Sequence, residues 1–347
     1  MARPKKVSQT QLARELGISQ ALVSLVLNGR KQGISPQTYD RTWAHAMKRG
    51  YHPKGMRLAS SPAAKGRQIG IIFRAPLRLN TPSMYFGHVQ HGLHSAIEAR
   101  DYTTVFLGAE DQLDAAKLRR VFARGHSFLG LVLVGEVTRG LLDQLRKFGL
   151  RIVAVSARYP GLCHSVLGNE PQALQSIVEH LYQLGHRRFG WLGGNVGLGR
   201  HESRLQALES ALAGVKLKLK PQYAVKLKDG DRIDGAEAVL SLLPLARRAD
   251  FPTAFITYNT LMAAGAVRAL IREGWDMPGD CSVASADYSP IARENTPTLT
   301  AAGSNPEKLG EAAARLVLEA PTSADDGFTD LMLPAQLFAG DSTGPAK

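Results

Sequence analysis

From residue 69 onward, short apolar runs of strand length alternate with longer amphipathic segments of helix length. The expected strands are 69–73, 104–107, 129–134, 152–155, 189–192, 224–226, 254–257 and 283–286. The expected helices are 86–100, 113–122, 141–148, 170–184, 202–212, 235–245 and 261–273. Fully apolar strands between helices indicate parallel sheets covered on both faces. Because the alternation restarts after Asn169, it predicts two doubly wound α/β subdomains whose shared crevice binds a small molecule.

A different pattern occupies residues 8–28, which predict two short helices around a tight turn. Ser8 is placed to cap the first helix, with Gln11 three residues on to complete a capping box. Gly17 supplies the turn, and Ser19 is the expected cap of the second helix. The expected apolar faces are Leu12, Ala13 and Leu16 on the first helix and Leu22, Val23, Val26 and Leu27 on the second.

A third helix follows, with Ser35 as its cap, Pro36 at its first position and Gly50 just past its end. Three such helices have a small core and leave the second helix exposed. This arrangement predicts a helix-turn-helix head, in which the second helix enters the major groove of DNA.

Charge supports the same interpretation independently. Residues 1–67 contain thirteen Lys and Arg against only Glu15 and Asp40, a net +11 of the +13 carried by the whole chain. An ordinary solvated basic face usually has acids interspersed, and this segment has almost none. A surface that binds a polyanion is therefore expected in the amino-terminal fifth of the chain.

Between head and body, residues 51–67 are rich in Pro, Gly and small side chains, which is typical of a linker. The sequence thus predicts a DNA-binding domain at 1–52, a hinge at 53–67 and a two-lobed effector-binding and dimerisation domain at 68–340.

The sequence lacks the signals that are typical of membrane proteins, secreted proteins, metalloproteins and enzymes. There is no apolar stretch near the ~18 residues of a membrane span and no apolar segment of a secretory signal, so a cytoplasmic protein without membrane contact is expected. Cys163 and Cys281 are isolated, and the ten His lack metal-ligand spacing, so no metal site and two buried free thiols are expected. A glycine-rich run at 193–199 lacks the dinucleotide-binding spacing and is interpreted as a loop lining the crevice. With no nucleophile motif either, we expect no catalytic residues, no cofactor and no enzyme activity.

The ordered set of motifs along the chain resembles the LacI family of bacterial transcription regulators. The resemblance covers about 7–343 and rests on residues 12–19, 23–24, 28 and 50–53 in the head, and on 184–188, 204–205, 252–255, 265–266, 278–283, 287, 297–300 and 310–313 in the body. It implies a periplasmic-binding-protein-like body and a homodimer that binds a pseudo-palindromic DNA operator. It also implies a small-molecule effector in the cleft that changes DNA affinity, most often in a repressor.

By the family pattern, Gln20, Ala21 and Leu25 contact bases. Gln can bond an adenine edge, whereas Ala and Leu can only pack on a thymine methyl. Most relatives have Arg at position 25, so an atypical operator is expected; packing in the head core is the equal alternative for Leu25. At position 22, where relatives have Thr, we expect Leu22 to be a core residue. The expected phosphate contacts are Ser8, Ser19, Ser24 and Asn28.

The hinge is the weakest part of the match, because Gly55 disfavours a helix by about 1 kcal/mol relative to Ala. Met56, Arg57 and Leu58 are the expected hinge residues, with Leu58 or Met56 as an apolar wedge in the minor groove. We expect this hinge to fold only when DNA is bound.

In the cleft, the family pattern assigns effector binding to Arg204, Asn259 and Asp287, a set of donors and acceptors suited to hydroxyls or a carboxylate. The alternative is an ordinary surface or salt-bridge role for Arg204 and Asp287. The chain departs from the pattern at Thr260, 168–170 and Tyr288, where relatives carry acids that grip sugar hydroxyls. A sugar or related metabolite is expected, but these lost acids count against a simple sugar. Trp191, Tyr85 and Phe86 are candidates for a stacking wall, with core packing the alternative for each.

Two alternative hypotheses of function are compatible with the two-lobed α/β body. One is a two-lobed solute-binding protein without a DNA role, which the basic head and the missing export signal disfavour. The other is an α/β enzyme with an accessory DNA-binding head, which would need a catalytic constellation that the sequence does not contain.

Overall fold

The computed structural model describes residues 8–27, 34–48, 67–75, 84–122, 128–320 and 327–347. The chain forms two compact units. One is the head, described at 8–27 and 34–48, and the other contains nearly all of the described residues from 67 onward. No helix in these ranges combines the length and the apolar character that a membrane span needs.

The head contains the three expected helices, α1 (Gln9–Leu16), α2 (Gln20–Leu27) and α3 (Pro36–Lys48). Ser8 caps α1, accepting a hydrogen bond from the Gln11 N–H at 3.1 Å. The Gln11 side chain donates to Glu15 instead of returning to Ser8, so the second half of the expected capping box is wrong. Gly17 ends α1 in the left-handed conformation at φ 67°, which Gly adopts without steric cost.

Packing of the three helices produces a small core. It consists of Leu12, Ala13, Val23, Leu27 and Ala46, with Ile18 partly buried against it. Leu16 and Leu22, expected on the apolar faces, are only half-buried. Two polar contacts add to this packing: Glu15 on α1 meets His45 on α3 at 2.7 Å, and Arg41 donates to the Leu16 carbonyl at 2.9 Å.

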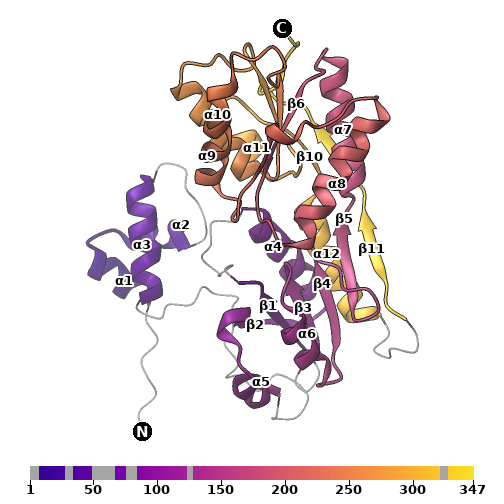
Figure 1. The fold of residues 1–347 in the computed structure, drawn as a ribbon. Helices are drawn as coiled ribbons and strands as arrows, with labels where there is room; N and C mark the ends of the chain where they lie inside the picture. Colours follow the sequence, from indigo (N-terminus) through magenta and orange to yellow (C-terminus); the bar gives the residue numbers. More distant parts are fainter. Residues whose placement is uncertain (1–7, 28–33, 49–66, 76–83, 123–127, 321–326) are drawn as a thin grey trace. The chain divides into compact units, whose positions relative to one another are not determined.

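The second unit has two lobes, each built on a six-stranded sheet, as the alternation of strands and helices predicted (Figure 1). The sheet of the first lobe has the order β11-β5-β4-β3-β1-β2. Its strands are β1 (Gln68–Phe73), β2 (Thr103–Ala109), β3 (Phe128–Val134), β4 (Arg151–Val155), β5 (His164–Gly168) and β11 (Asp330–Leu333). The helices of this lobe are α4 (Met84–Glu98), α5 (Ala115–Phe122), α6 (Arg139–Arg146) and α12 (Pro306–Glu319).

The sheet of the second lobe has the order β12-β10-β9-β8-β6-β7. Its strands are β6 (Phe189–Gly193), β7 (Ala224–Lys226), β8 (Ala254–Thr257), β9 (Ser282–Ser285), β10 (Thr300–Gly303) and β12 (Gln336–Phe338). The helices are α7 (Glu170–Gln183), α8 (Gly199–Gly214), α9 (Arg232–Leu242), α10 (Thr260–Arg272) and α11 (Ile291–Glu294). All pairs given for this sheet are parallel except β10 with β12.

The lobes are interleaved in sequence rather than simply successive. After β10 in the second lobe, the chain returns to the first lobe, where α12 packs against α4 and β11 pairs in parallel with β5. It then goes back to the second lobe as β12. This return was not predicted, because β5, β10, β11, β12, α11 and α12 were not recognised in the sequence.

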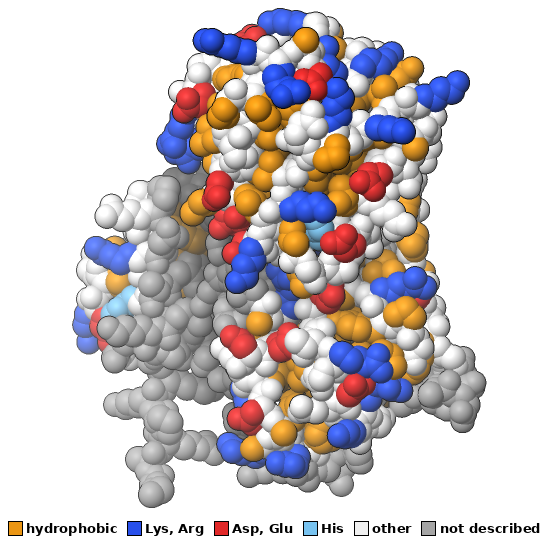
Figure 2. Space-filling model, viewed as in Figure 1, with side chains coloured by type: hydrophobic (Ala, Val, Ile, Leu, Met, Phe, Trp, Pro, Cys, Tyr) orange, Lys and Arg blue, Asp and Glu red, His pale blue; other side chains and the backbone are white. Residues whose placement is uncertain are grey.

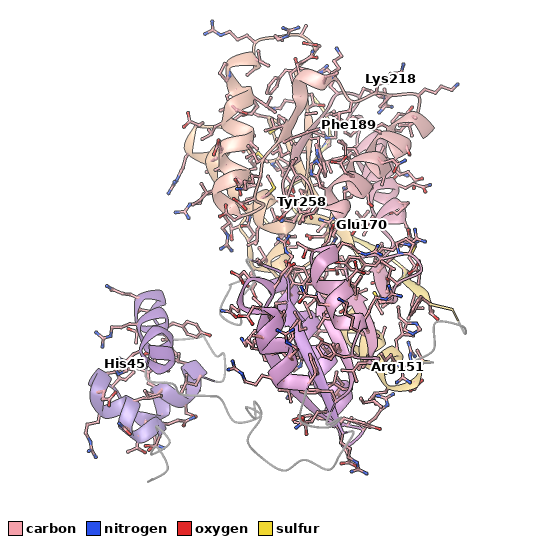
Figure 3. The ribbon with its side chains drawn as sticks, turned by 60° about the horizontal axis from the view of Figure 1, so that its bottom comes forward. His45, Arg151, Glu170, Phe189, Lys218 and Tyr258 are labelled. Atoms are coloured by element: carbon pink, nitrogen blue, oxygen red, sulfur yellow. The ribbon has the colours of Figure 1, made fainter. Side chains whose placement is uncertain are left out.

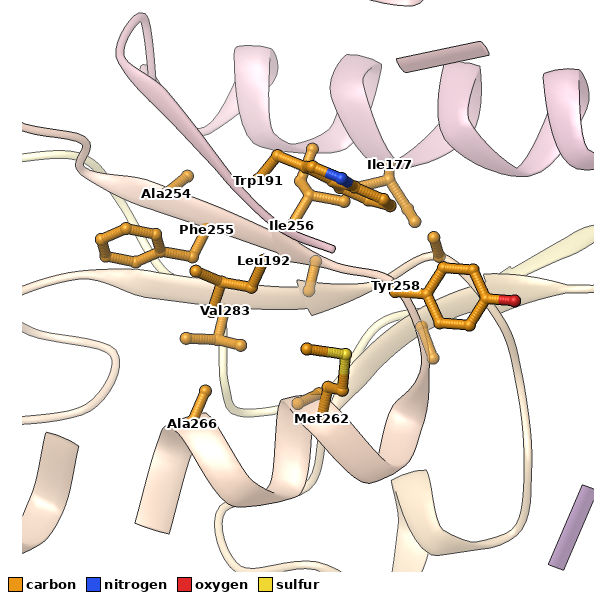
Figure 4. Close-up of a cluster of buried hydrophobic side chains, with 14 of the residues drawn as sticks. Ile177, Trp191, Leu192, Ala254, Phe255, Ile256, Tyr258, Met262, Ala266 and Val283 are labelled. Atoms are coloured by element: carbon orange, nitrogen blue, oxygen red, sulfur yellow. The ribbon is translucent and has the colours of Figure 1, made fainter. Parts of the chain in front are cut away.

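The core of the second lobe lies between its sheet and the helices on either face (Figure 4). Trp191 on β6 is completely buried there, beside Ile177 of α7. The core alternative for Trp191 is therefore confirmed, and this ring is no stacking wall. On the visible face of the second unit, Lys and Arg are interspersed with Asp and Glu, in keeping with the near-neutral body of the sequence (Figure 2).

Candidate functional site

One face of α2 is exposed and polar or small, opposite its buried residues. Gln20 and Ala21 are exposed, and Leu25 is 38% exposed, so Leu25 is not a buried residue of the head core and its contact with the groove stays a prediction. Ser24 is half-buried beside them, one turn after Gln20. This face contains all three of the residues predicted to contact bases.

Two of the expected phosphate-contact serines have a structural role as well. Ser19 caps α2 by accepting from the Leu22 N–H at 3.1 Å, as Ser8 does for α1. Both serines are exposed, so each stands at the amino end of a helix that faces solvent. Asn28 and the hinge residues Met56, Arg57 and Leu58 lie outside the described residues, and their roles stay predictions.

A pocket of about 600 Å³, open to solvent, lies between the two lobes of the second unit. It forms there because the loops at the carboxyl ends of both parallel sheets meet at this place. From the first lobe it is lined by Arg74, Tyr85, Phe86, Gly135, Glu136 and Ser156, and from the second by Asn195, Leu198, Arg200, Arg204, Tyr258, Asn259, Thr260, Leu261, Asp287, Ser289 and Ile291. The three predicted effector residues are all among them, as is the 193–199 loop.

Arg204, on the buried face of α8, is only 1% exposed and is fully engaged by the protein. Its Nε donates to Glu170 at 2.7 Å, and its Nη groups reach Asp287 at 3.4 and 3.5 Å. It also donates to the Tyr258 carbonyl, and the Tyr258 ring lies 4.6 Å from the guanidinium carbon. Figure 3 labels Tyr258 and Glu170 where the two lobes meet. The salt-bridge alternative is therefore what the structure contains for Arg204.

The other two predicted effector residues also use their polar groups internally. Asn259 caps α10 by accepting from the Met262 N–H at 2.8 Å, and its amide donates to the Gly230 carbonyl at 2.8 Å. Asp287 accepts from the Thr260 N–H at 2.9 Å and from the Thr260 hydroxyl at 3.1 Å. Thr260, which replaces an acid of the family pattern, thus supports Asp287.

Three contacts join the lobes across the pocket. Arg74, just after β1, donates to the Asn195 side-chain oxygen at 2.9 Å. Glu136, just after β3, accepts from the N–H of Gly199 at 2.9 Å, at the start of α8. Arg200 donates to the Tyr85 hydroxyl at 3.2 Å. Polar contacts between described residues of the two lobes therefore join the lobes at this pocket.

Known proteins resemble this chain over nearly its whole length. A model of the periplasmic-binding-protein-like domain matches residues 178–343. The maltose regulon regulatory protein MalI of Escherichia coli is 27% identical over 98% of this chain and 99% of its own. The transcriptional repressor PurR of Yersinia enterocolitica is 25% identical over 89% of this chain and 88% of its own.

These matches agree with the resemblance to the LacI family of transcription regulators that the sequence motifs indicate. Solved structures agree on the fold. A transcriptional regulator CelR–cellobiose complex superimposes with a TM-score of 0.68 at 22% identity, covering 98% of this chain and all of that one. A lac repressor dimer bound to operator and an anti-inducer gives 0.66 at 18% identity with the same coverage.

The residues that the sequence did not predict as members of the site are Arg74, Glu136, Glu170 and Arg200. The signal was present for two of them, because Arg74 and Glu136 directly follow expected strands, where ligand-binding loops of such sheets begin. For Glu170 the sequence showed only a departure from the family pattern. In the structure Glu170 forms ion pairs with two arginines, Arg200 at 2.8 Å and Arg204 at 2.7 Å.

The titration of Glu170 gives a pH prediction. Burial alone would raise the pKa of Glu170, but Arg204 and Arg200 outweigh it and hold the pKa below the ordinary 4.5. Above pH 4.5 this carboxylate contributes its full stabilisation, and the contribution is lost as the pH falls from 4.5 through the lower folded-state pKa. The stability difference between wild type and Glu170→Gln is therefore expected to be constant above pH 5 and to shrink below it. Urea unfolding of both proteins from pH 7 to 3 measures this difference. A difference that grows on acidification would contradict the ion-pair role.

Proposed function

We propose that this protein is a ligand-responsive transcriptional repressor that binds a pseudo-palindromic operator as a homodimer. Residues 1–52 are the DNA-binding head, 53–67 the hinge, and 68–340 the domain that binds the effector and forms the dimer. The single observation that best supports the proposal is the combination of a basic helix-turn-helix head with a pocket at the junction of two lobes.

For the DNA side, the support is the exposed face of α2. Recognition helices read base edges with side chains near their amino ends, and Gln20 and Ala21 open this helix. The basic residues of the head supply the phosphate contacts that give affinity and make it salt-dependent. A protein that binds operator DNA is expected in the cytoplasm. Binding DNA and a small-molecule effector requires no catalytic step.

For the effector side, the support is the set of contacts between the lobes. A small molecule in the pocket binds open and closed arrangements of the lobes differently, so it shifts their populations. Since the heads of a dimer must match two half-sites about one DNA turn apart, a lobe shift that alters their spacing changes operator affinity.

A thermal-shift screen of sugars, sugar acids, sugar phosphates and nucleobases tests this proposal. A cleft ligand raises the melting temperature by mass action, and it should also change the affinity for operator fragments. A ligand that stabilises the protein while leaving operator affinity unchanged would contradict a regulatory cleft.

Replacing Gln20 separates base reading from phosphate binding. Gln20→Ala removes the side chain placed to bond an adenine edge, so it should cost about 1–3 kcal/mol of discrimination at one operator position. The salt dependence of binding should stay nearly the same, because no phosphate contact is lost. Fluorescence anisotropy with a set of single-base operator variants measures both quantities. A uniform loss of affinity for all sequences, with a changed salt slope, would instead assign Gln20 to the phosphates.

A further inference from the structure

The pocket contains three arginines, and their partners differ. Arg204 is balanced by Glu170 and Asp287, and Arg200 is balanced by Glu170 and bonded to Tyr85. The carboxylates at the back of the pocket are therefore committed to these two cations. Arg204 has no donor left for an effector, contrary to its expected role as the gripping arginine.

Arg74 is the third arginine, and among the described residues it has no ion-pair partner. Its guanidinium donates a hydrogen bond to the neutral Asn195 amide oxygen at 2.9 Å. Its Nε is buried without a hydrogen-bond partner. Glu136 also lines the pocket but accepts from Gly199, and it forms no ion pair with Arg74. Among the residues that the structure describes, no carboxylate pairs with this guanidinium.

The backbone next to Arg74 makes room for this arrangement. Gly135, at φ +84°, follows β3, and a Cβ there would lie 2.8 Å from Arg74 Cδ. The guanidinium therefore lies beside a glycine in the pocket wall, between the two lobes. Burial lowers the pKa of Arg74, because removing a cation from water is costly, and the charges of Glu136 and Asp229 only partly oppose this shift.

Buried donors without partners are rare in folded proteins and call for a specific explanation. A bound anion supplies one here, because carboxylates and phosphates accept two hydrogen bonds from one guanidinium. The lost acids of the family pattern point the same way, since Thr260 and Tyr288 leave fewer carboxylates to repel an anion.

We propose that the effector carries an anionic group, a carboxylate or a phosphate, which binds Arg74 at the lobe junction. This inference rests on the proposed function and narrows its effector class from any small metabolite to an acidic one. Because Arg74 and Asn195 come from opposite lobes, an anion held by Arg74 acts where the lobes are joined.

The test compares matched neutral and anionic ligands on the full-length protein. Glucose, gluconate and glucose 6-phosphate form one set, ribose and ribose 5-phosphate another, and inorganic phosphate is the minimal probe. Thermal shift and calorimetric titration are carried out on wild type, Arg74→Met and the control Arg139→Met. Arg139 is an exposed arginine that pairs with Asp143 and lies outside the pocket.

The expected result is stabilisation of wild type and Arg139→Met by at least one anionic ligand and not by its neutral counterpart. Arg74→Met should bind that ligand about tenfold more weakly or worse, since a charge-assisted pair is lost. The sugar-acid and phosphate arms show which anion is preferred. Without ligand, Arg74→Met should melt at the same temperature as wild type or higher, because the variant removes a half-buried cation that has no ion-pair partner among the described residues.

Four results would overturn the inference. Equal binding of neutral and anionic ligands removes the need for a cation, and an unchanged response in Arg74→Met places the anion elsewhere. A ligand-free Arg74→Met that melts well below wild type makes Arg74 a structural residue. Failure of every anion to bind wild type also counts against it. Operator binding is measured in parallel, so a neutral ligand that changes it leaves the proposed function standing while this inference fails.

Discussion

Leu12→Ala is expected to abolish operator binding while leaving the effector domain folded. Leu12 is fully buried in the small head core, where it packs with Ala13, Val23, Leu27 and Ala46. A buried Leu→Ala change costs about 2–5 kcal/mol, which is most or all of the stability that a domain of this size can have. The head should therefore be largely unfolded, and affinity should fall to that of non-specific binding or below, a loss of about a thousandfold. Fluorescence anisotropy with operator DNA and a thermal melt of the same sample measure the two effects.

Leu25→Ala is the matched control, because it removes the same atoms from an exposed position on the neighbouring helix. It should leave the head folded and alter only base preference. If Leu12→Ala bound operator as tightly as wild type, the three-helix head would not be the DNA-binding element.

Arg204→Leu should destabilise the two-lobed domain strongly. The change leaves Asp287 and part of Glu170 buried without their cation, and breaking such a buried ion pair costs about 3–5 kcal/mol. Glu170→Gln added to this variant removes one uncompensated charge and should restore part of the loss. Chemical unfolding of the single and double variants measures the coupling between the two residues.

An exposed pair provides the comparison for this prediction. Lys308 and Glu311 are 2.7 Å apart on α12, with side chains 62% and 44% exposed, so Lys308→Ala should change the stability little. A loss for Arg204→Leu no larger than that for Lys308→Ala would mean that the buried network does not hold the lobe together. Arg204 would then be free to act on the effector directly.

Apolar runs and helical periodicity in the sequence predicted individual strands and helices, but not the pairing of strands that are distant in sequence. Strands β7 and β8 agree with the expected ranges, and β8 is an apolar run with Pro252 and Thr253 before it and Asn259 shortly after it. Strand β10 was missed because Thr300–Gly303 consists of small residues without an apolar run. The pairing of β11 with β5 joins segments more than 160 residues apart, which no periodicity within either segment can indicate.

The site shows the same limit. The resemblance to the LacI family placed Arg204, Asn259 and Asp287 at the cleft, and the pocket contains all three. It could not show that the hydrogen-bond donors of Arg204 are already bonded to protein groups, because Glu170 becomes a partner of Arg204 only through the packing of α7 on α8. Nor could it single out Arg74, whose distinguishing property is a missing partner that exists only in the folded chain.

The most direct test of the account is selection of duplex DNA from a random pool by the full-length protein at low ionic strength. The account predicts enrichment of a pseudo-palindromic sequence, whose affinity for the protein falls steeply between 50 and 200 mM salt, by about 10³–10⁵-fold if 6–10 phosphates are contacted. Retention of no duplex, with or without a mixture of sugars and acidic metabolites, would contradict it.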